Sequence, residues 1–240
     1  MATYVMSDLH GCYDEFNQML NLISFSDYDE LWIIGDVCDR GYKSIPLLQE
    51  IMSRKNMHLI MGNHDEWLLQ FSQYMIDAKK DFRSQSMRND YLVWTLRNGG
   101  LSTSDGFMDL DYHECYDIKY YLEHCPYYKE LNIHGSKFLL VHAGLSKEYM
   151  KPSTVIASVP KDILLWEKIG LDDNPFIDTT MIVGHTPTML YGPEYAGKIA
   201  ISKKKNLYHI DCGCVFGQSL GCLRLDDMHE FYVPSKNASK

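Results

Sequence analysis

The chain has 240 residues and a formal net charge of −9 at pH 7, which argues against nucleic acid as the main partner because such proteins need a basic surface. No uninterrupted apolar stretch approaches the ~20 residues of a membrane span, so we expect no membrane partner. The length suits one α/β domain with a sizeable buried core.

The cysteines and the first residues bear on the cellular compartment. The seven cysteines are odd in number and lack the spacing of a disulfide framework, and Cys212 and Cys214 are too close for a usual zinc motif. Met1 leads directly into the strand-like run Thr3–Met6, without the pattern of a signal peptide. We therefore expect reduced thiols and a cytoplasmic protein.

Three polar clusters in the N-terminal part each follow directly on an apolar, strand-like run. The runs are Thr3–Met6, Leu31–Ile34 and His58–Met61, and the clusters are Asp8–Gly11, Gly35–Gly41 and Gly62–Asp65. Asp8 and Asp36 are 28 positions apart, and Asp36 and Asn63 are 27 apart, which suits a strand and its covering helix. We expect three parallel strands with the clusters at their carboxyl edge, where α/β sheets bind ligands.

Further elements follow from apolar periodicity. We expect helices at Asp14–Ile23 and Ser44–Met52, strands at Phe138–Val141, Met181–Val183 and Tyr208–Asp211, and a closing hairpin of Leu220–Leu225 and His229–Val233. Two of these strands lead into a histidine, His142 and His185.

Residues 66–126 read as a largely helical insertion over one rim of the site, with its helical period broken near Gly99 and Gly100. We expect Trp67, Trp94 and Tyr91 to fill its core, and substrate stacking is the alternative. No linker divides the chain, so residues 1–234 are predicted to form a single domain, followed by a polar tail at 235–240.

The clusters supply carboxylate, imidazole and amide donors, a set that suits Mn, Fe or Zn better than an oxygen cage would. Two ions about 4 Å apart need a shared anionic ligand, and Asp36 lies between the other two clusters. A single such Asp is most often a turn former, and a single histidine is most often a core residue. Their joint occurrence favours a metal site.

The motifs Asp8-x-His10-Gly11, Gly35-Asp36-x-x-Asp39-Arg40-Gly41, Gly62-Asn63-His64-Asp65, Val141-His142-Ala143-Gly144 and Gly184-His185-Thr186 resemble those of the metallophosphoesterases. The resemblance covers Met1 to about Asp226 and is closest to bacterial and phage-type serine/threonine protein phosphatases. Symmetrical diadenosine tetraphosphate hydrolases are near relatives. It implies an α/β fold with a β-sandwich flanked by helices.

The resemblance also implies two divalent metal ions, with manganese favoured and iron or zinc as alternatives. The implied ligands are Asp8, His10 and Asp36 for one ion, and Asp36, Asn63, His142 and His185 for the other. A hydroxide that bridges the ions would attack phosphorus directly.

Three residues are assigned to catalysis. Arg40 can grip the phosphate bidentately, beside Asn63 as a further substrate contact. His64 is placed to protonate the leaving oxygen, and Asp39 would hold its other ring nitrogen and favour imidazolium. Asp65 is interpreted as structural.

Two positions stay open. Relatives commonly carry an Arg that binds phosphate two positions after a Trp, where this chain has Lys168, which keeps the charge but loses the planar fork. Lys168 is therefore either a second phosphate ligand or a solvated side chain. Asp211 either orients a metal-bound histidine or caps a turn.

The leading functional hypothesis is hydrolysis of phosphoserine or phosphothreonine monoesters, on a phosphorylated protein, a peptide or another small phosphoester. The alternative is cleavage of dinucleoside polyphosphates such as diadenosine tetraphosphate by the same chemistry. A non-catalytic scaffold on this fold is a third hypothesis, which the complete set of ligand residues disfavours.

Overall fold

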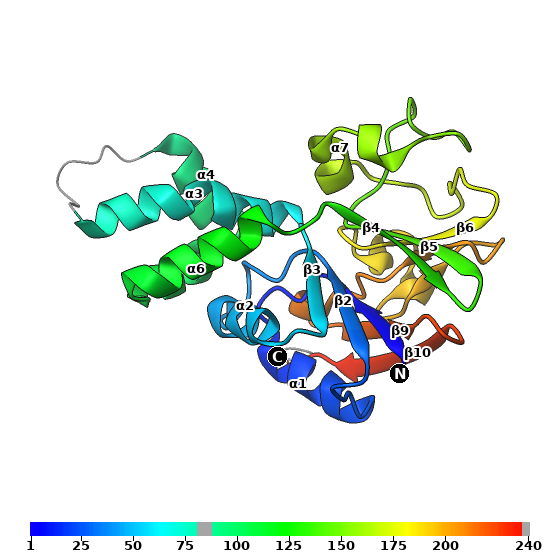
Figure 1. The fold of residues 1–240 in the computed structure, drawn as a ribbon, viewed down its shortest axis with the longest axis horizontal. Helices are drawn as coiled ribbons and strands as arrows, with labels where there is room; N and C mark the ends of the chain where they lie inside the picture. The colour runs from blue at the N-terminus through cyan, green and yellow to red at the C-terminus, as the bar shows by residue number, and fades with distance from the viewer. Residues whose placement is uncertain (81–87, 237–240) are drawn as a thin grey trace.

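The computed structural model describes residues 1–80 and 88–236, which form two five-stranded sheets with helices around them (Figure 1). The first sheet has the strand order β10-β9-β1-β2-β3. Its strands are β1 (Thr3–Met6), β2 (Glu30–Ile34), β3 (Met57–Ile60), β9 (Ser219–Arg224) and β10 (His229–Pro234). β1, β2 and β3 are parallel and β9 and β10 form an antiparallel hairpin, which confirms the predicted strands.

The second sheet has the order β4-β5-β6-β8-β7. Its strands are β4 (Tyr128–Ile133), β5 (Ser136–Val141), β6 (Thr179–Val183), β7 (Ala200–Ile201) and β8 (Leu207–His209). The parallel strands β5, β6 and β8 match the predicted runs. The sequence did not predict β4, because this edge strand is only half-buried and carries no continuous apolar run.

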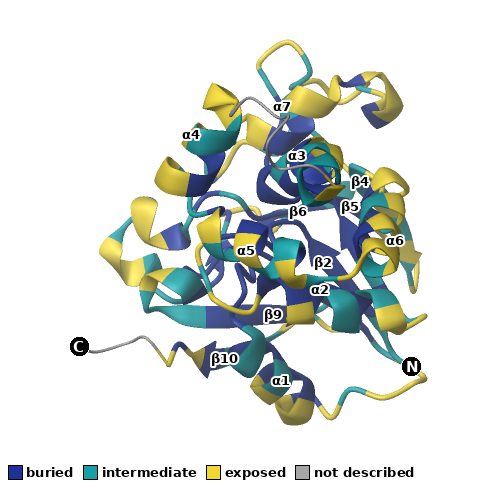
Figure 2. Ribbon diagram, turned by 90° about the vertical axis from the view of Figure 1, so that its left-hand side faces the viewer, coloured by how far each residue is buried: buried dark blue, intermediate teal, exposed yellow. Residues whose placement is uncertain are grey.

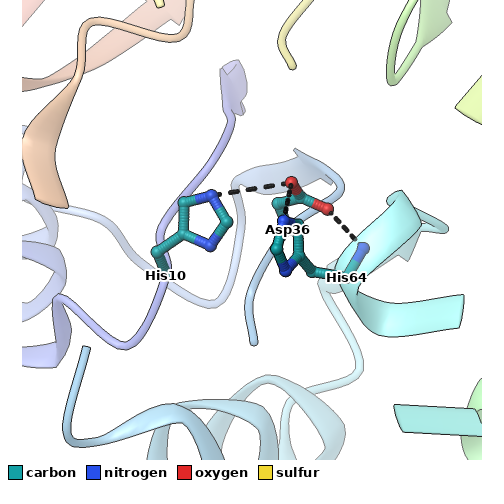
Figure 3. Close-up of side chains that lie close together, drawn as sticks. All are labelled: His10, Asp36 and His64. Carbon is teal, nitrogen blue, oxygen red and sulfur yellow. Dashed lines mark hydrogen bonds and ion pairs between the residues drawn. The ribbon is translucent and has the colours of Figure 1, made fainter. Parts of the chain in front are cut away.

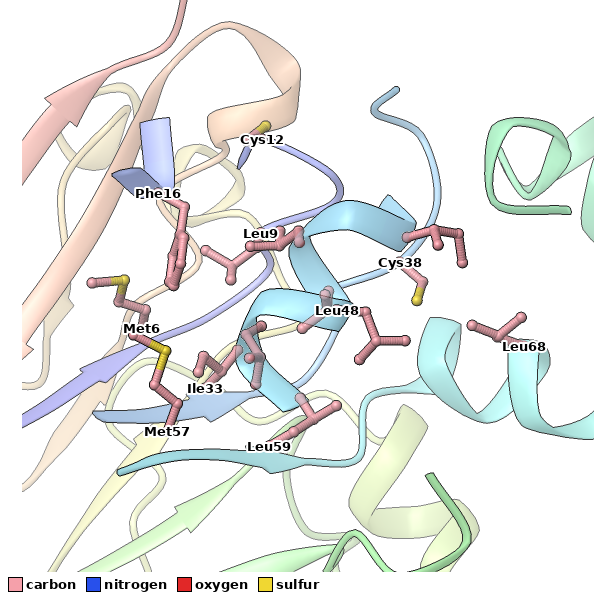
Figure 4. Packing of buried hydrophobic residues seen from close by; sticks show 14 of the residues in the cluster. Met6, Leu9, Cys12, Phe16, Ile33, Cys38, Leu48, Met57, Leu59 and Leu68 are labelled. Carbon is pink, nitrogen blue, oxygen red and sulfur yellow. The ribbon is translucent and has the colours of Figure 1, made fainter. Parts of the chain in front are cut away.

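Successive residues of β1 point to opposite faces of the first sheet, as in any strand. Met6 packs with Phe16 and Leu48 from the helices α1 (Tyr13–Leu22) and α2 (Ser44–Ser53), as Figure 4 shows. Val5 belongs to the core shared with the second sheet. The molecule is therefore a β-sandwich with helices on its outer faces, which confirms the expected fold class.

The insertion is helical, as predicted, and Figure 2 shows that its helices bury one side and expose the other. It contains α3 (Asn63–Lys80), α4 (Asn89–Arg97), α5 (Leu101–Asp109) and α6 (Tyr112–Glu123). α3 begins at Asn63 rather than Glu66, so the third polar cluster itself forms the first turn of a helix. The predicted break at Gly99 and Gly100 separates α4 from α5.

The remaining helical segments are short. They are α7 (Lys161–Trp166) and the 3₁₀ turns η1 (Ile156–Ser158), η2 (Thr188–Leu190), η3 (Pro193–Tyr195) and η4 (Cys214–Phe216). No helix among the described residues is long and apolar enough to cross a membrane. All seven cysteines are described, and each is a free thiol.

The start of the expected polar tail packs against α1. Ser235 is buried, the Lys236 backbone N–H donates to Glu15 Oε1 at 2.8 Å, and Lys236 Nζ lies 3.1 Å from Asp14 Oδ2. The rest of the tail, 237–240, lies outside the described residues.

Candidate functional site

The two sheets bring the six predicted ligand residues to one edge of the sandwich. Asp8 and His10 follow β1, Asp36 follows β2, and Asn63 follows β3, all in the first sheet. The second sheet supplies His142 after β5 and His185 after β6. Strands from both sheets therefore converge on a single cluster.

Asp36 lies at the centre of this cluster, and Figure 3 shows it next to His10 and His64. Its Oδ2 is 3.5 Å from Nε2 of His10, and its Oδ1 is 3.4 Å from Nε2 of His142. The structure places Asp36 in two groups of donor atoms that could each hold a cation, one with His10 and His64 and the other with His142 and His185. This is the position that a shared ligand requires.

The neighbours of the histidines fix which ring nitrogens face the cluster. Nδ1 of His10 is 2.7 Å from Cys38 O, and Nδ1 of His142 is 2.8 Å from Ile34 O. A carbonyl only accepts, so each Nδ1 carries the proton that it donates, and Nε2 is the ring nitrogen that faces the cluster. The Asn63 amide oxygen also points inward, 2.9 Å from both His142 Nε2 and His185 Nδ1.

Asp8 has a buried oxygen without a partner among the described residues, Oδ1. Its other oxygen, Oδ2, accepts from the His185 backbone N–H at 2.9 Å and from the Ser7 hydroxyl. An orphaned carboxylate oxygen is costly when buried, and a cation would satisfy it. Together with the ring nitrogens that face the cluster, this oxygen makes the cluster a good fit for divalent cations.

Burial disfavours the charged forms of His10, His185 and Asp36. It lowers the pKa of His10 well below the ordinary value and that of His185 to about 3, so both rings are neutral, as metal ligands must be. Burial, followed by the charges of Asp8 and Asp65, raises the pKa of Asp36 well above the ordinary value. Positive charge in the site would offset this cost.

The backbone of the site is strained. Ten described residues other than glycine have positive φ, and six of them are site residues: Asp8, His10, Asp36, Asp39, Arg40 and His185, with φ between 42° and 73°. Such conformations cost about 1–3 kcal/mol each and concentrate at functional sites. The fold therefore tolerates strain to hold these side chains in place.

Asp65 joins two of the loops, which agrees with its predicted structural role. Its carboxylate accepts backbone N–H groups from Asp36 at 2.8 Å, Val37 at 3.0 Å, and Cys38 and Gly62 at 3.2 Å. The loop after β2 is thereby tied to the first turn of α3.

His64 lies between Asp39 and Arg40. Its Nδ1 is 2.6 Å from Asp39 Oδ2, and its Nε2 is 2.9 Å from Arg40 Nη2, while the same guanidinium also contacts His10 Nε2. Because Arg40 donates to Nε2, the proton of the neutral ring lies on Nδ1, toward Asp39. Burial and the Arg40 charge hold the pKa of His64 well below the ordinary value. The contact with Asp39 is present as expected, and that Asp39 favours imidazolium stays a prediction.

The insertion contributes contacts that the sequence did not predict. Trp94 is buried, as expected for a core residue, but its Nε1–H also donates to Asp39 Oδ2 at 2.7 Å. Thr103 Oγ1 accepts from the Asp39 backbone N–H, and Gly99 O accepts from the Arg40 backbone N–H, both at 2.8 Å. No local signal marks these residues, because each lies more than fifty positions from its partner.

The structure bears on the two open positions in different ways. Lys168 is exposed, and its charge follows burial and His142 among the causes that lower the pKa of His185, so it lies near the cluster. Asp211 is buried and accepts from the Gly213 backbone N–H at 3.0 Å, which is the turn-capping alternative.

The family model for calcineurin-like phosphoesterases matches residues 1–209, and the chain belongs to this family of metal-dependent phosphoesterases. A symmetrical bis(5'-nucleosyl)-tetraphosphatase of Haemophilus ducreyi is 32% identical over 167 residues, which are 69% of this chain and 53% of that protein. The chain thus spans about half the length of that relative. The enzyme of the same name from Methylobacillus flagellatus is 24% identical over 98% of this chain and 95% of its own length.

Solved structures show the same fold. A chain proposed to be a diadenosine tetraphosphatase superposes with a TM-score of 0.65 at 18% identity, covering 98% of this chain and 94% of its own. A protein serine/threonine phosphatase of Saccharomyces cerevisiae superposes with a TM-score of 0.59 at 15% identity, covering 98% and 79%. At these identities the likeness concerns the fold alone.

Proposed function

We propose that this protein hydrolyses symmetrical dinucleoside tetraphosphates, with diadenosine tetraphosphate yielding two ADP. The supporting observation is that three relatives named symmetrical bis(5'-nucleosyl)-tetraphosphatases match 96–98% of the chain at 23–25% identity. These relatives favour the alternative of the sequence analysis over its leading hypothesis, the phosphoserine or phosphothreonine monoester.

The proposed ligands are those of the sequence analysis, one set around each side of Asp36. They are Asp8, His10 and Asp36 for one ion and Asp36, Asn63, His142 and His185 for the other, with manganese the favoured metal. When bound there, two divalent ions would supply Lewis acidity and lower the pKa of water.

Arg40 is the proposed phosphate clamp. Its guanidinium nitrogens lie next to His10 and His64, where two non-bridging phosphate oxygens could each accept one N–H. Lys168 adds a second positive charge nearby without a planar fork. Two positively charged side chains at separate positions suit a chain of four phosphates, because this chain carries more negative charge than one phosphomonoester.

His64 is the proposed proton donor, and Asn63 is a proposed substrate contact. In the reaction, water oxygen bonds to one central phosphorus, the bond from that phosphorus to the bridging oxygen breaks, and this oxygen leaves with the second ADP. His64 Nε2 accepts from Arg40 in this structure, so a phosphate that takes over the Arg40 N–H would free Nε2 to take up a proton and pass it to the leaving oxygen. Asp39 positions the ring through Nδ1.

The test is product analysis with Mn²⁺ and diadenosine tetraphosphate. ADP as the only nucleotide product supports the proposal, with the Asp36→Asn variant as the control for contaminating enzymes. Formation of ATP and AMP would contradict the symmetrical mode. Faster phosphate release from a phosphothreonine peptide than ADP formation, compared as kcat/KM, would restore the phosphomonoester hypothesis.

A further inference from the structure

A wall of four aromatic rings borders the candidate site. Trp67 lies 5.0 Å from His64, measured between ring centroids, and 5.2 Å from Trp166. Trp166 in turn lies 6.1 Å from His185. The two tryptophans therefore connect the proposed proton donor with a proposed metal ligand.

Trp166 is unusually open for a tryptophan. It is 44% exposed, whereas Trp94 is 1% exposed and Trp32 is 9% exposed. Trp94 also stacks on Phe71, with 16° between the ring planes and 5.2 Å between centroids, as core aromatics do. Trp166 meets both of its aromatic neighbours edge-on instead, at 62° and 84°. Core filling therefore accounts for Trp94 but not for Trp166.

The wall is held in place from both sides. The Ala143 backbone N–H, next to the predicted ligand His142, donates to Leu164 O at 2.9 Å and so anchors α7 beside the site. Lys161 Nζ, at the start of α7, lies 2.7 Å from Glu66 Oε1 on α3. Both helices lie in the upper half of Figure 1. These contacts place α3 beside α7 and so bring Trp67 next to Trp166.

We propose that Trp166, supported by Trp67, is the stacking surface for one nucleobase of the substrate, an inference that rests on the proposed function. A nucleobase is planar and joined to its phosphates by a short ribose link. The wall offers exposed indole next to His64, which Arg40 contacts, and two positions before Lys168 in the chain, and both positive charges suit the phosphates. Trp67 is partly exposed beside His64, so the proposal takes up the stacking alternative that the sequence analysis left open for this side chain.

A comparison of competitive inhibition by ADP and by pyrophosphate distinguishes the contribution of the base to binding from that of the phosphates. With p-nitrophenyl phosphate as the reporter substrate, Trp166→Ala should weaken inhibition by ADP about 5- to 150-fold, the value of one base-stacking contact. Pyrophosphate lacks a base and should inhibit the variant and the parent protein alike. Trp166→Phe should recover part of the ADP inhibition, because a smaller ring still stacks.

Direct binding provides a second readout that needs no turnover. ADP should quench tryptophan fluorescence of the parent protein, and Trp166→Phe should lose most of that quenching. Tyr28→Ala is the matched control. Tyr28 is an aromatic residue that is 81% exposed and lies just before the start of β2, whereas the site lies after the end of this strand. It should leave both ADP inhibition and quenching unchanged.

The outcomes separate the two proposals. If the parent protein forms ADP from diadenosine tetraphosphate, and Trp166→Ala weakens ADP and pyrophosphate equally, the stacking site is wrong and the proposed function stands. If Trp166→Ala instead impairs a phosphothreonine peptide selectively while the parent protein forms no ADP, the wall binds peptide and both proposals fail. Circular dichroism melting excludes unfolding of the variant as the cause.

Discussion

The position of Asp36 has consequences that no other proposed ligand shares. Its two carboxylate oxygens face different histidines, Oδ2 toward His10 and Oδ1 toward His142. Asp8, by contrast, faces His185 through one oxygen and has the other free of partners among the described residues. Removing charge at Asp36 therefore affects both proposed metal positions, and removing it at Asp8 affects one.

We expect Asp36→Asn to lose both metals and nearly all activity, and Asp8→Asn to lose less. Loss of a residue that only orients a ligand costs about 10- to 100-fold in metal affinity, so loss of a shared ligand should exceed 100-fold. Elemental analysis after dialysis, together with turnover, checks this. Two retained metals and a near-normal rate in Asp36→Asn would disprove the bridging role.

His64→Ala should impair substrates according to their leaving group. General acid help is worth about 10²- to 10⁴-fold when the leaving oxygen needs a proton, so a phosphoserine peptide should lose far more rate than p-nitrophenyl phosphate. Asp39→Asn should give the same pattern more weakly. Metal content should stay normal in both variants. Equal fractional losses on the two substrates would reject the proton-donor role, and loss of a metal would make His64 a ligand.

At the scale of elements, the spacing of apolar residues is the reason why most strands and helices could be predicted from the sequence. The parallel strands have continuous apolar runs and the helices have amphipathic ones, and parallel topology then places the polar clusters on one edge. The Trp94 contact with Asp39 depends instead on how the insertion docks onto the sheet, which no local pattern encodes. The exposed wall at Trp166 likewise depends on the pairing of α3 with α7.

The junction between β2 and α3 depends on Asp65. Asp65→Ala leaves four buried backbone N–H groups without their acceptor, so we expect a loss of about 3 kcal/mol or more in the free energy of unfolding. Activity should fall as well, because the loop carrying Asp36 loses its anchor. Urea denaturation measures the effect, and Asp105→Ala, at an exposed position of α5, serves as the control. A midpoint shift no larger than that of the control would contradict this role.

At the scale of the molecule, the site is also a joint between the two sheets. Four proposed ligands come from the first sheet, while His142 and His185 come from the second. Direct contacts already cross this joint, such as that between Asn63 and His142 at 2.9 Å. Ions bound there would add bonds from each sheet to a common centre, so metal binding should stabilise the packing of the whole sandwich.

We therefore expect divalent metal to raise the melting temperature of the whole chain in a single transition. A ligand at 100 times its Kd stabilises the native state by about 2.7 kcal/mol, which corresponds to roughly 5–10 °C for a protein of this size. Calorimetry of dialysed protein with increasing Mn²⁺, and with Zn²⁺ or Mg²⁺ for comparison, measures the shift. His185→Ala, which removes a ligand of the second sheet, should reduce the shift, and Asp36→Asn should nearly abolish it. An equal shift in all three proteins would show that the metal acts elsewhere on the acidic surface and that the sheets are not joined through this site.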